Sequence, residues 1–145
     1  MNITPPKSVE ITPSPPHVLL SVCIPTYNRA TLLSILVKKL LSLLSGNFGT
    51  NYEIVISDNH STDSTSALIE EKFKHIAQVR VVSPPQHYPT AEENLCFGIS
   101  MCVGTYVWTL GDDDSIDLET VPILHSLLEQ NQYDLLIFNS RSVSY

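Results

Sequence analysis

Basic side chains are scarce in this chain of 145 residues, which has 8 lysines and arginines against 15 aspartates and glutamates and a formal net charge of −7. A nucleic-acid-binding domain needs a cationic face to meet the phosphate backbone. The acidic balance therefore argues against nucleic acid as a partner. A phosphate-bearing ligand would need a metal ion or local backbone dipoles to bind here.

Cysteine is also rare, with three residues at Cys23, Cys96 and Cys102. An odd number without paired short spacings fits neither a disulfide framework nor a zinc site. We expect reduced thiols that pack as small hydrophobic side chains. Four of the five histidines lie scattered with no carboxylate or cysteine at metal-ligand spacing, which favours surface or core positions over a zinc site or a catalytic dyad: His60, His75, His87 and His125.

Several motifs of nucleotide-binding and hydrolytic enzymes are missing. The chain has no G-x-G-x-x-G, no G-x-x-x-x-G-K-[ST] and no G-x-S-x-G. It therefore carries neither a dinucleotide fingerprint nor a P-loop, and nothing supports an acyl hydrolase. Gly104 and Gly111 are expected at strand boundaries. A nucleotide would have to be held by other means.

Long apolar runs are missing as well. The N-terminal stretch has no apolar segment of the kind that a secretory signal needs, and no uninterrupted apolar run reaches membrane-spanning length. We therefore expect a cytoplasmic protein. Residues 1–16 hold five of the ten prolines and are expected to form a flexible leader. Residues 17–145 are expected to form one domain, since 43% of the chain is hydrophobic and can fill a core.

What is present is a regular alternation of strand-like and helix-like segments. Short apolar runs rich in β-branched residues predict strands, and apolar residues at helical spacing predict helices. The predicted strands are 17–25, 52–57, 79–83, 105–110 and 133–140, and the predicted helices are 30–47, 61–76, 90–103 and 118–130. Strands that alternate with single helices predict an α/β fold of three layers, Rossmann-like, with a mostly parallel central sheet and helices on both faces.

Local signals place the ends of these helices. Gly46 stands where a C-cap glycine belongs, and Ser61 or Asp63 is the expected N-cap of the second helix. Thr90-Ala91-Glu92-Glu93 matches a capping box. The first helix carries Lys38 and Lys39, and we favour a core-facing helix with two solvated lysines over a membrane-surface helix.

The unusual polar chemistry lies in three loops. In a parallel sheet, ligands bind in the crevice beyond the carboxyl ends of the strands. The loops at that edge are "PTYNR" after the first strand, "DNHSTD" after the second and "GDDDS" after the fourth. Asp58 or Asn59 could offer hydrogen bonds to a base or ribose, or could simply be loop residues that favour a helix N-cap. Tyr27 could stack on a base or cover the edge of the core.

The triplet Asp112-Asp113-Asp114 places three like charges side by side. Adjacent carboxylates raise one another's pKa unless a cation neutralises them. Mg²⁺ or Mn²⁺ prefers oxygen ligands and usually takes one or two carboxylates plus substrate phosphates, whereas the spacing of a Ca²⁺ loop is missing. Taken alone, the triplet could equally be an exposed acidic turn that caps the following helix.

The three loops together resemble a known family. "SVCIPTYNRATLL", "YEIVISDNHSTDST" and "GTYVWTLGDDD", in this order, look like the nucleotide-sugar-binding half of a family 2 glycosyltransferase of the GT-A fold. "SDNHSTD" with "YVWTLGDDD" is similar to the abequosyltransferase-like branch, which builds bacterial O-antigen and related polysaccharides. The resemblance covers about residues 18–140.

The resemblance implies roles for residues of these loops. The nucleotide sugar would be bound by Pro25, Tyr27, Arg29, Asp58, Asn59 and Asp112, and a Mn²⁺ or Mg²⁺ cofactor by Asp113, or by Asp114 in the alternative alignment. The family usually has two aspartates where this chain has Asp58-Asn59. Many members also place an arginine before the asparagine of the third helix, where this chain has Glu93-Asn94, and we expect Arg29 to supply that charge.

The implied reaction is inverting transfer from a nucleotide-diphosphate sugar to a glycan or lipid-linked acceptor, with the full-length protein at the inner face of the membrane as a peripheral protein. The family's general base lies well downstream of the acidic motif, so we expect it beyond Tyr145 and expect this chain alone to bind donor without transferring it. The alternative is a non-catalytic nucleotide-sugar-binding module. A receiver domain of a signalling protein is disfavoured, because it expects a lone aspartate after the third strand and a lysine after the fifth, and neither is present.

Overall fold

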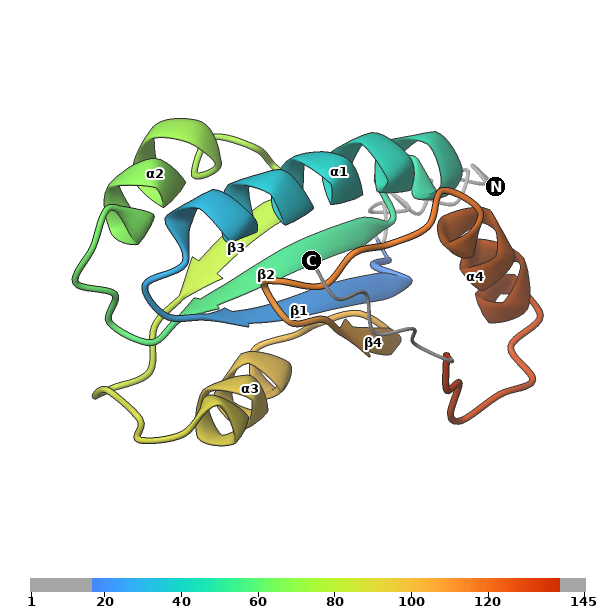
Figure 1. Cartoon of the computed structure of the whole chain (residues 1–145). Helices are drawn as coiled ribbons and strands as arrows, with labels where there is room; N and C mark the ends of the chain where they lie inside the picture. Colours follow the sequence, from blue (N-terminus) through green and yellow to red (C-terminus); the bar gives the residue numbers. More distant parts are fainter. Residues whose placement is uncertain (1–16, 139–145) are drawn as a thin grey trace, which may run out of the picture.

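Four parallel strands form the centre of the fold. The computed structural model describes residues 17–138. Its strands lie in the order β3-β2-β1-β4, all parallel (Figure 1): β1 (Leu20–Thr26), β2 (Tyr52–Asp58), β3 (Val79–Val82) and β4 (Tyr106–Thr109). A helix connects each strand to the next, because parallel neighbours need a crossover connection. The prediction of a parallel α/β sheet is confirmed.

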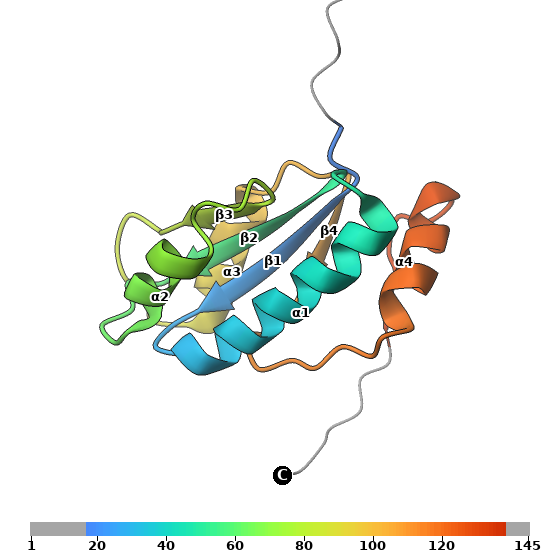
Figure 2. The ribbon, with the colours of Figure 1, turned by 90° about the horizontal axis from the view of Figure 1, so that it is seen from above.

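Helices cover both faces of this sheet. One face carries α1 (Ala30–Phe48), with α2 (Thr65–Lys72) and α4 (Thr120–Glu129) packed beside it, and the other face carries α3 (Ala91–Ser100) (Figures 1 and 2). The chain runs outward from β1 to β2 and β3, then returns to place β4 on the other side of β1. This reversal of strand order is the topological switch point where open α/β sheets bind ligands.

The two central strands are buried on both faces. All of β2 is buried, and β1 is buried except for the half-buried Pro25. Burial on both faces explains why these strands appear in the sequence as continuous apolar runs and not as an alternating pattern. The core therefore lies along β1 and β2, directly behind the loops that follow them.

Helix α1 packs one side onto the sheet through five buried aliphatic residues, while Lys38 on the other side is exposed: Leu33, Leu36, Val37, Leu40 and Leu44. Within residues 17–138 it is the one helix long and apolar enough to cross a membrane by length and composition. Its buried aliphatic residues belong to the core, which supports the core-facing prediction, while Leu32 and Ile35 of the same helix are exposed.

The predicted end of α1 at Gly46 is wrong. The helix continues to Phe48, and Gly49 follows it with φ +58°. Glycine adopts this left-handed conformation without the clash that a Cβ would cause, so Gly49 is the residue that ends the helix. Gly46 lies inside the helix with open space where a Cβ would be.

Helix α2 is shorter than predicted. It begins at Thr65 and not at Ser61, because the polar groups of residues 61–63 are hydrogen-bonded to Asn28 and Asp58 in a loop. The predicted N-cap, Ser61 or Asp63, is wrong, because Ser64 occupies that position; Asp63 accepts the backbone N–H of Thr65 with its carboxylate (2.8 Å). The capping box at Thr90 and Glu93 is confirmed, although α3 ends at Ser100 and not at Val103.

The predicted last strand is not formed within the described part of it. Residues 133–138 have no strand structure, and residues 139 and 140 of the prediction lie outside the described residues. The segment still packs its side chains beside β4, where Phe138 contacts Trp108 with ring centroids 6.1 Å apart. Leu136 is half-buried by this packing, whereas Leu135 and Ile137 stay exposed, so the segment contacts the core without a backbone ladder.

Candidate functional site

The predicted loops meet at one edge of the sheet. Thr26 and Asp58 are register partners at the carboxyl ends of β1 and β2. The backbone N–H of Leu110, just after β4, donates to Cys23 in β1 (3.0 Å). The three polar loops therefore start side by side, as the parallel topology requires.

The loops after β1 and β2 are held together by Asn28, which has φ +55°. Its side-chain carbonyl accepts the backbone N–H groups of Thr62 (2.7 Å) and Asp63 (3.2 Å). Its own backbone N–H donates to Ser61 Oγ (2.9 Å), and that of Arg29 donates to Thr65 Oγ1 (3.1 Å). These bonds fix the two residues that flank Asn28, Tyr27 and Arg29, relative to the second loop.

Asp58 is buried and turned into its own loop. One carboxylate oxygen accepts from the backbone N–H (3.0 Å) and the hydroxyl (2.6 Å) of Ser61, and the other accepts from Ser66 Oγ (2.9 Å). In this structure Asp58 shapes the second loop, and its predicted contact with a base stays a prediction.

Asn59 is also buried and binds the segment between β3 and α3. Its side-chain amide donates to the carbonyl of Tyr88 (2.9 Å) and accepts the backbone N–H of Tyr88 (2.8 Å). The backbone carbonyl of Asn59 accepts from Nδ1 of His87 (2.9 Å). These hydrogen bonds hold His87 and Tyr88 at the carboxyl end of β2. The predicted contact of Asn59 with a ligand stays a prediction.

The first aspartate of the acidic triplet is held by β1. Asp112 is 9% exposed, and Thr26 Oγ1 donates to its Oδ2 (2.8 Å). Burial raises the pKa of Asp112, while the hydrogen bond from Thr26 and the Arg29 guanidinium act in the opposite direction and the charge of Asp113 adds to the rise. A bound cation would favour the ionised form of this carboxyl group.

The other two aspartates have different partners. Asp113 has a largely exposed side chain, and Arg29 Nη1 lies 3.2 Å from its Oδ2 and 3.8 Å from Oδ1 of Asp112. Asp114 accepts the backbone N–H of Gly111 (2.7 Å) and so closes the turn of its own loop. Arg29 therefore neutralises part of the charge of the triplet and reduces the repulsion between the adjacent carboxylates.

These loops enclose a cavity of about 410 Å³, within the usual range for small-ligand sites. Five predicted site residues from β1 and its loop and from the acidic loop line it, together with Asn59: Pro25, Tyr27, Arg29, Asp112 and Asp113. Asp58 and Asp114 are not among its lining residues. The cavity thus has charged groups on one wall and aromatic rings on another.

The aromatic wall was not predicted in full. Tyr27 and His87 are in contact, with ring centroids 4.8 Å apart and ring planes inclined by 49°. Tyr88 and Thr90 from the same segment also line the cavity. No sequence pattern marks His87, because its place depends on a bond to Asn59, 28 residues away in the chain.

Helix α3 lines the cavity with two residues, Ala91 at its start and Asn94 one turn further along. Asn94 is 2% exposed; its amide donates to the carbonyl of Ser57 (2.9 Å) and accepts from Ser57 Oγ (2.7 Å). Asn94 therefore attaches α3 to the carboxyl end of β2. Glu93, which precedes it, is engaged by Thr90 in the capping box.

No group of three or more His, Cys, Asp or Glu side chains with metal-binding geometry occurs among residues 17–138. This does not disqualify the acidic loop, because Mg²⁺ and Mn²⁺ commonly take one or two protein carboxylates and complete their shell with water and phosphate. The exposed carboxylate of Asp113 on the cavity wall fits that donor set. The three cysteines are free thiols; Cys23 is buried as predicted, Cys102 is partly buried, and the packing prediction is wrong for Cys96, which is exposed.

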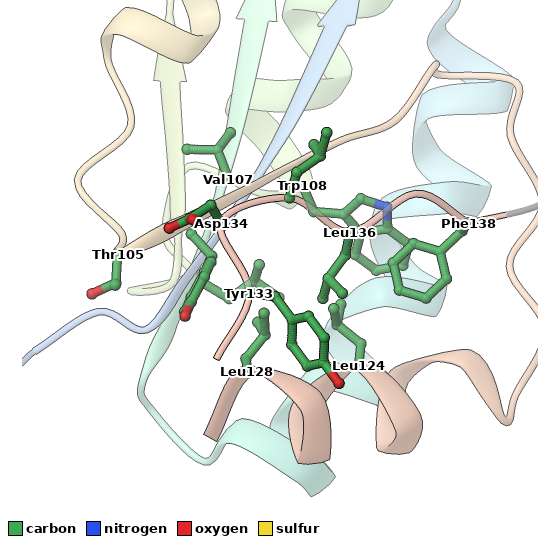
Figure 3. A pocket seen from close by; sticks show the side chains of 12 residues that line it. Thr105, Val107, Trp108, Leu124, Leu128, Tyr133, Asp134, Leu136 and Phe138 are labelled. Carbon is green, nitrogen blue, oxygen red and sulfur yellow. The ribbon is translucent and has the colours of Figure 1, made fainter. Parts of the chain in front are cut away.

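A second, smaller cavity of about 170 Å³ lies between the β4 edge and α4 (Figure 3). Trp108, Leu124, Leu128, Leu136 and Phe138 point toward it. It contains no cluster of charged groups, since Asp134 is its one acidic lining residue. Its lining combines core residues of β1 and α4 with side chains of residues 133–138, and it lies apart from the polar loops.

Solved structures with the same arrangement define the class of fold. Crystal structures of residues 1–349 of TarS from Staphylococcus aureus, alone and in complex with UDP, superpose with a TM-score of 0.66 at 22% identity, over 88% of this chain and 38% of theirs. A mannosyltransferase from Pyrobaculum calidifontis in complex with GDP-Man and Mn²⁺ gives a TM-score of 0.50 at 21% identity, over 67% of this chain and 28% of its own. The fold is GT-A.

The family follows from the sequence match. The model for glycosyl transferase family 2 matches residues 21–145, and the chain belongs to that family. Abequosyltransferase RfbV of Salmonella typhimurium strain LT2 is 30% identical over 122 residues, which are 83% of this chain and 35% of RfbV. This chain spans about a third of the length of such curated relatives. The predicted resemblance is confirmed, including its abequosyltransferase-like relative.

Proposed function

We propose that this chain binds the donor in an inverting glycosyltransferase that moves a sugar from a nucleotide-diphosphate sugar to a polysaccharide or lipid-linked acceptor. Membership of glycosyl transferase family 2 supports the transferase activity. The relatives include an abequosyltransferase and a poly(ribitol-phosphate) β-N-acetylglucosaminyltransferase, which supports bacterial O-antigen or cell-surface polysaccharide synthesis as the setting.

The observation that carries the proposal is the two-sided cavity at the switch point of the sheet. Its aromatic wall, Tyr27 and His87, suits the flat base of a nucleotide, and its charged wall, Arg29 with Asp112 and Asp113, suits a diphosphate with its cation. TarS, which shares the fold, has been crystallised with UDP and with UDP-GlcNAc. The residues of both walls lie within the range that the family match covers.

Each charged residue has a distinct part in the proposed site. Thr26 orients Asp112 through one oxygen, so the other oxygen of Asp112 is available to ribose or to a water beside the cation. Arg29 can exchange the carboxylate of Asp113 for a phosphate oxygen, because its side chain is 48% exposed and its guanidinium is bound on one side. Asp113 would then hold Mn²⁺ or Mg²⁺. When bound, that cation supplies electrostatic stabilisation of the charge on the leaving diphosphate.

We place the general base outside the residues that the structure describes, in the acceptor half of a longer protein. The charged side chains that line this cavity, Arg29, Asp112 and Asp113, are assigned to the diphosphate, its cation and ribose, so none is left to activate an acceptor hydroxyl. The setting of the full-length protein would be the cytoplasm, at the inner face of the membrane. A non-catalytic nucleotide-sugar-binding module is the second candidate.

Metal-dependent nucleotide binding tests the proposal. Calorimetric titration with UDP, CDP, GDP and dTDP, each with Mn²⁺ and with EDTA, should show binding of at least one nucleotide that is lost on chelation. Asp113→Ala should weaken that binding by at least about tenfold, because even partners that only orient metal ligands cost 10- to 100-fold.

Two variants control this experiment. Asp114→Ala should weaken binding less than Asp113→Ala, since Asp114 is committed to Gly111, and the reverse order would assign the metal to Asp114. Asp117→Ala removes the same charge from an exposed residue that does not line the cavity and should leave the affinity unchanged. Binding that is insensitive to both EDTA and Asp113→Ala would refute the metal role.

A further inference from the structure

We propose that His87 reads the base of the bound nucleotide, accepting a hydrogen bond at Nε2 from an N–H group on the edge of that base. The inference rests on the proposed function, because it assigns a residue to the aromatic end of the same cavity. It goes further by naming which side chain distinguishes one base from another, and by which chemistry.

The position of His87 is fixed by its neighbours. Its Nδ1 lies 2.9 Å from the backbone carbonyl of Asn59, and the next residue, Tyr88, forms two backbone hydrogen bonds with the side chain of Asn59. Asn59 itself is 4% exposed, and its backbone N–H donates to the carbonyl of Thr26 (3.0 Å). The imidazole is thus attached to the end of the central sheet although its segment is a loop.

The bond to Asn59 decides the tautomer. A backbone carbonyl can only accept, so Nδ1 of His87 must be the protonated nitrogen that donates to it. In the neutral imidazole the other nitrogen, Nε2, then carries a lone pair and no proton. No residue between 17 and 138 forms a hydrogen bond with Nε2, whereas the ring lines the cavity and is exposed.

The contact with Tyr27 places this acceptor beside a stacking surface. The two rings touch at 4.8 Å between centroids and are inclined by 49°, so they do not cover each other face to face. Tyr27 remains 43% exposed. A base that stacks on Tyr27 would therefore bring its edge toward His87, and bases are discriminated at their edges because all of them share a π face.

The chemistry that Nε2 would recognise is an N–H donor. Uracil, thymine and guanine offer a ring N–H, and cytosine and adenine offer an exocyclic amino group. A ring nitrogen lone pair of cytosine or adenine would instead face the lone pair of Nε2, which is unfavourable. His87 would therefore make the site sensitive to the donor pattern of the base and not merely to its size.

Three variants of His87 separate its ring, its bond to Asn59 and its acceptor. His87→Phe keeps a flat ring and removes both nitrogens. His87→Asn keeps a donor near the position of Nδ1, so the bond to Asn59 is retained, but it is too short to present an acceptor at Nε2. His87→Gln places an amide oxygen near Nε2 and should rescue binding. His75→Phe is the matched control, because His75 is exposed and does not line the cavity.

We expect that, for the nucleotide bound most tightly in the presence of Mn²⁺, His87→Phe and His87→Asn each weaken binding by roughly three- to tenfold, the cost of one neutral hydrogen bond. His87→Gln should recover most of that loss, and His75→Phe should change nothing. Tighter binding of UDP than of CDP would identify the ring N–H as the donor, and tighter binding of CDP would identify the amino group. Loss of discrimination between the two in His87→Phe is expected in either case.

A spectroscopic test does not depend on any nucleotide. Long-range ¹H–¹⁵N correlation spectra of the free protein at neutral pH should show the Nδ1–H tautomer for His87. The Nε2–H tautomer, or affinities that His87→Phe and His87→Asn leave unchanged, would overturn the inference while nucleotide binding by the wild-type chain keeps the proposed function intact. Absence of binding by the wild-type chain to every nucleotide would instead refute the proposed function.

Discussion

At the scale of single residues, two glycines differ in the space around them. A Cβ on Gly104, just before β4, would lie 2.6 Å from the backbone nitrogen of Ser21 and 2.7 Å from its hydroxyl oxygen. Gly104 also donates its backbone N–H to Ser21 Oγ (2.8 Å). Gly46, in contrast, lies inside a helix, and a Cβ at this position would meet no neighbouring atom within 4 Å. An alanine side chain would therefore clash with Ser21 at position 104 but would fit without a clash at position 46.

This contrast predicts opposite changes in stability. Gly104→Ala should lower the free energy of unfolding by about 1–3 kcal/mol, since the contacting atoms belong to the backbone of β1 and cannot move aside cheaply. Gly46→Ala should raise it by about 0.5–1 kcal/mol, because alanine loses less backbone entropy inside a helix. Urea unfolding followed by circular dichroism measures both changes. A destabilising Gly46→Ala would contradict the extension of α1 to Phe48.

At the scale of elements, a buried carboxylate joins three strands at the edge opposite the cavity. Glu53 of β2 is 5% exposed and accepts from Ser21 Oγ in β1 (2.6 Å) and from the backbone N–H of Val103 before β4 (2.9 Å). Its other oxygen pairs with Arg80 of β3 (2.8 Å), and Arg80 also donates to the carbonyl of Met101 (2.9 Å). Glu53 thus holds the amino ends of the strands as the polar loops hold the carboxyl ends.

Removing this carboxylate should destabilise the fold without weakening the donor site. Glu53→Ala leaves Arg80 and the hydroxyl of Ser21 without their partner, and we expect a loss of about 2–3 kcal/mol, reduced by the partial exposure of Arg80. Glu70→Ala breaks the exposed pair with Lys74 and should cost less than about 0.5 kcal/mol. Under conditions where both variants are folded, nucleotide affinity should equal that of the wild type. A cost for Glu53→Ala as small as that for Glu70→Ala would show that the network contributes nothing.

At the scale of the whole molecule, the two ends of the sheet have separate tasks. The amino ends are held by charge pairs and hydrogen bonds of Glu53, and the carboxyl ends carry the cavity. The net charge of −7 gives the molecule no general attraction for a diphosphate. Binding must therefore rely on local charge, namely Arg29 and a cation held by Asp113.

The proposed division between donor and acceptor halves makes a prediction for the whole chain. The 145-residue chain should bind donor but transfer no sugar, because we propose that the general base lies in the acceptor half of a longer protein. Release of nucleoside diphosphate from UDP-GlcNAc and other nucleotide sugars, measured with candidate glycan acceptors, should not exceed the rate without protein. Robust transfer by this chain would place the base among its own residues. A full-length form that binds donor and still transfers nothing would favour the non-catalytic module.

The sequence alone determined the class of fold and the edge of the sheet where the site lies. Continuous apolar runs with β-branched residues predicted β1 and β2, helical spacing predicted α1, and the order of strands and helices predicted the parallel sheet. These features depend on residues close together in the chain, which is why local patterns reveal them. Placement of the three polar loops then followed from topology.

Only the tertiary structure decided which side chains of those loops face the cavity. Asp58 turns into its own loop, Asn59 binds Tyr88, and Asp112 receives Thr26 from 86 residues away. His87 joins the cavity through Asn59, and residues 133–138 cover β4 without forming a ladder with it. Each of these outcomes is a competition for hydrogen-bond partners or packing space among segments distant in sequence, and such partners meet only once the chain has folded.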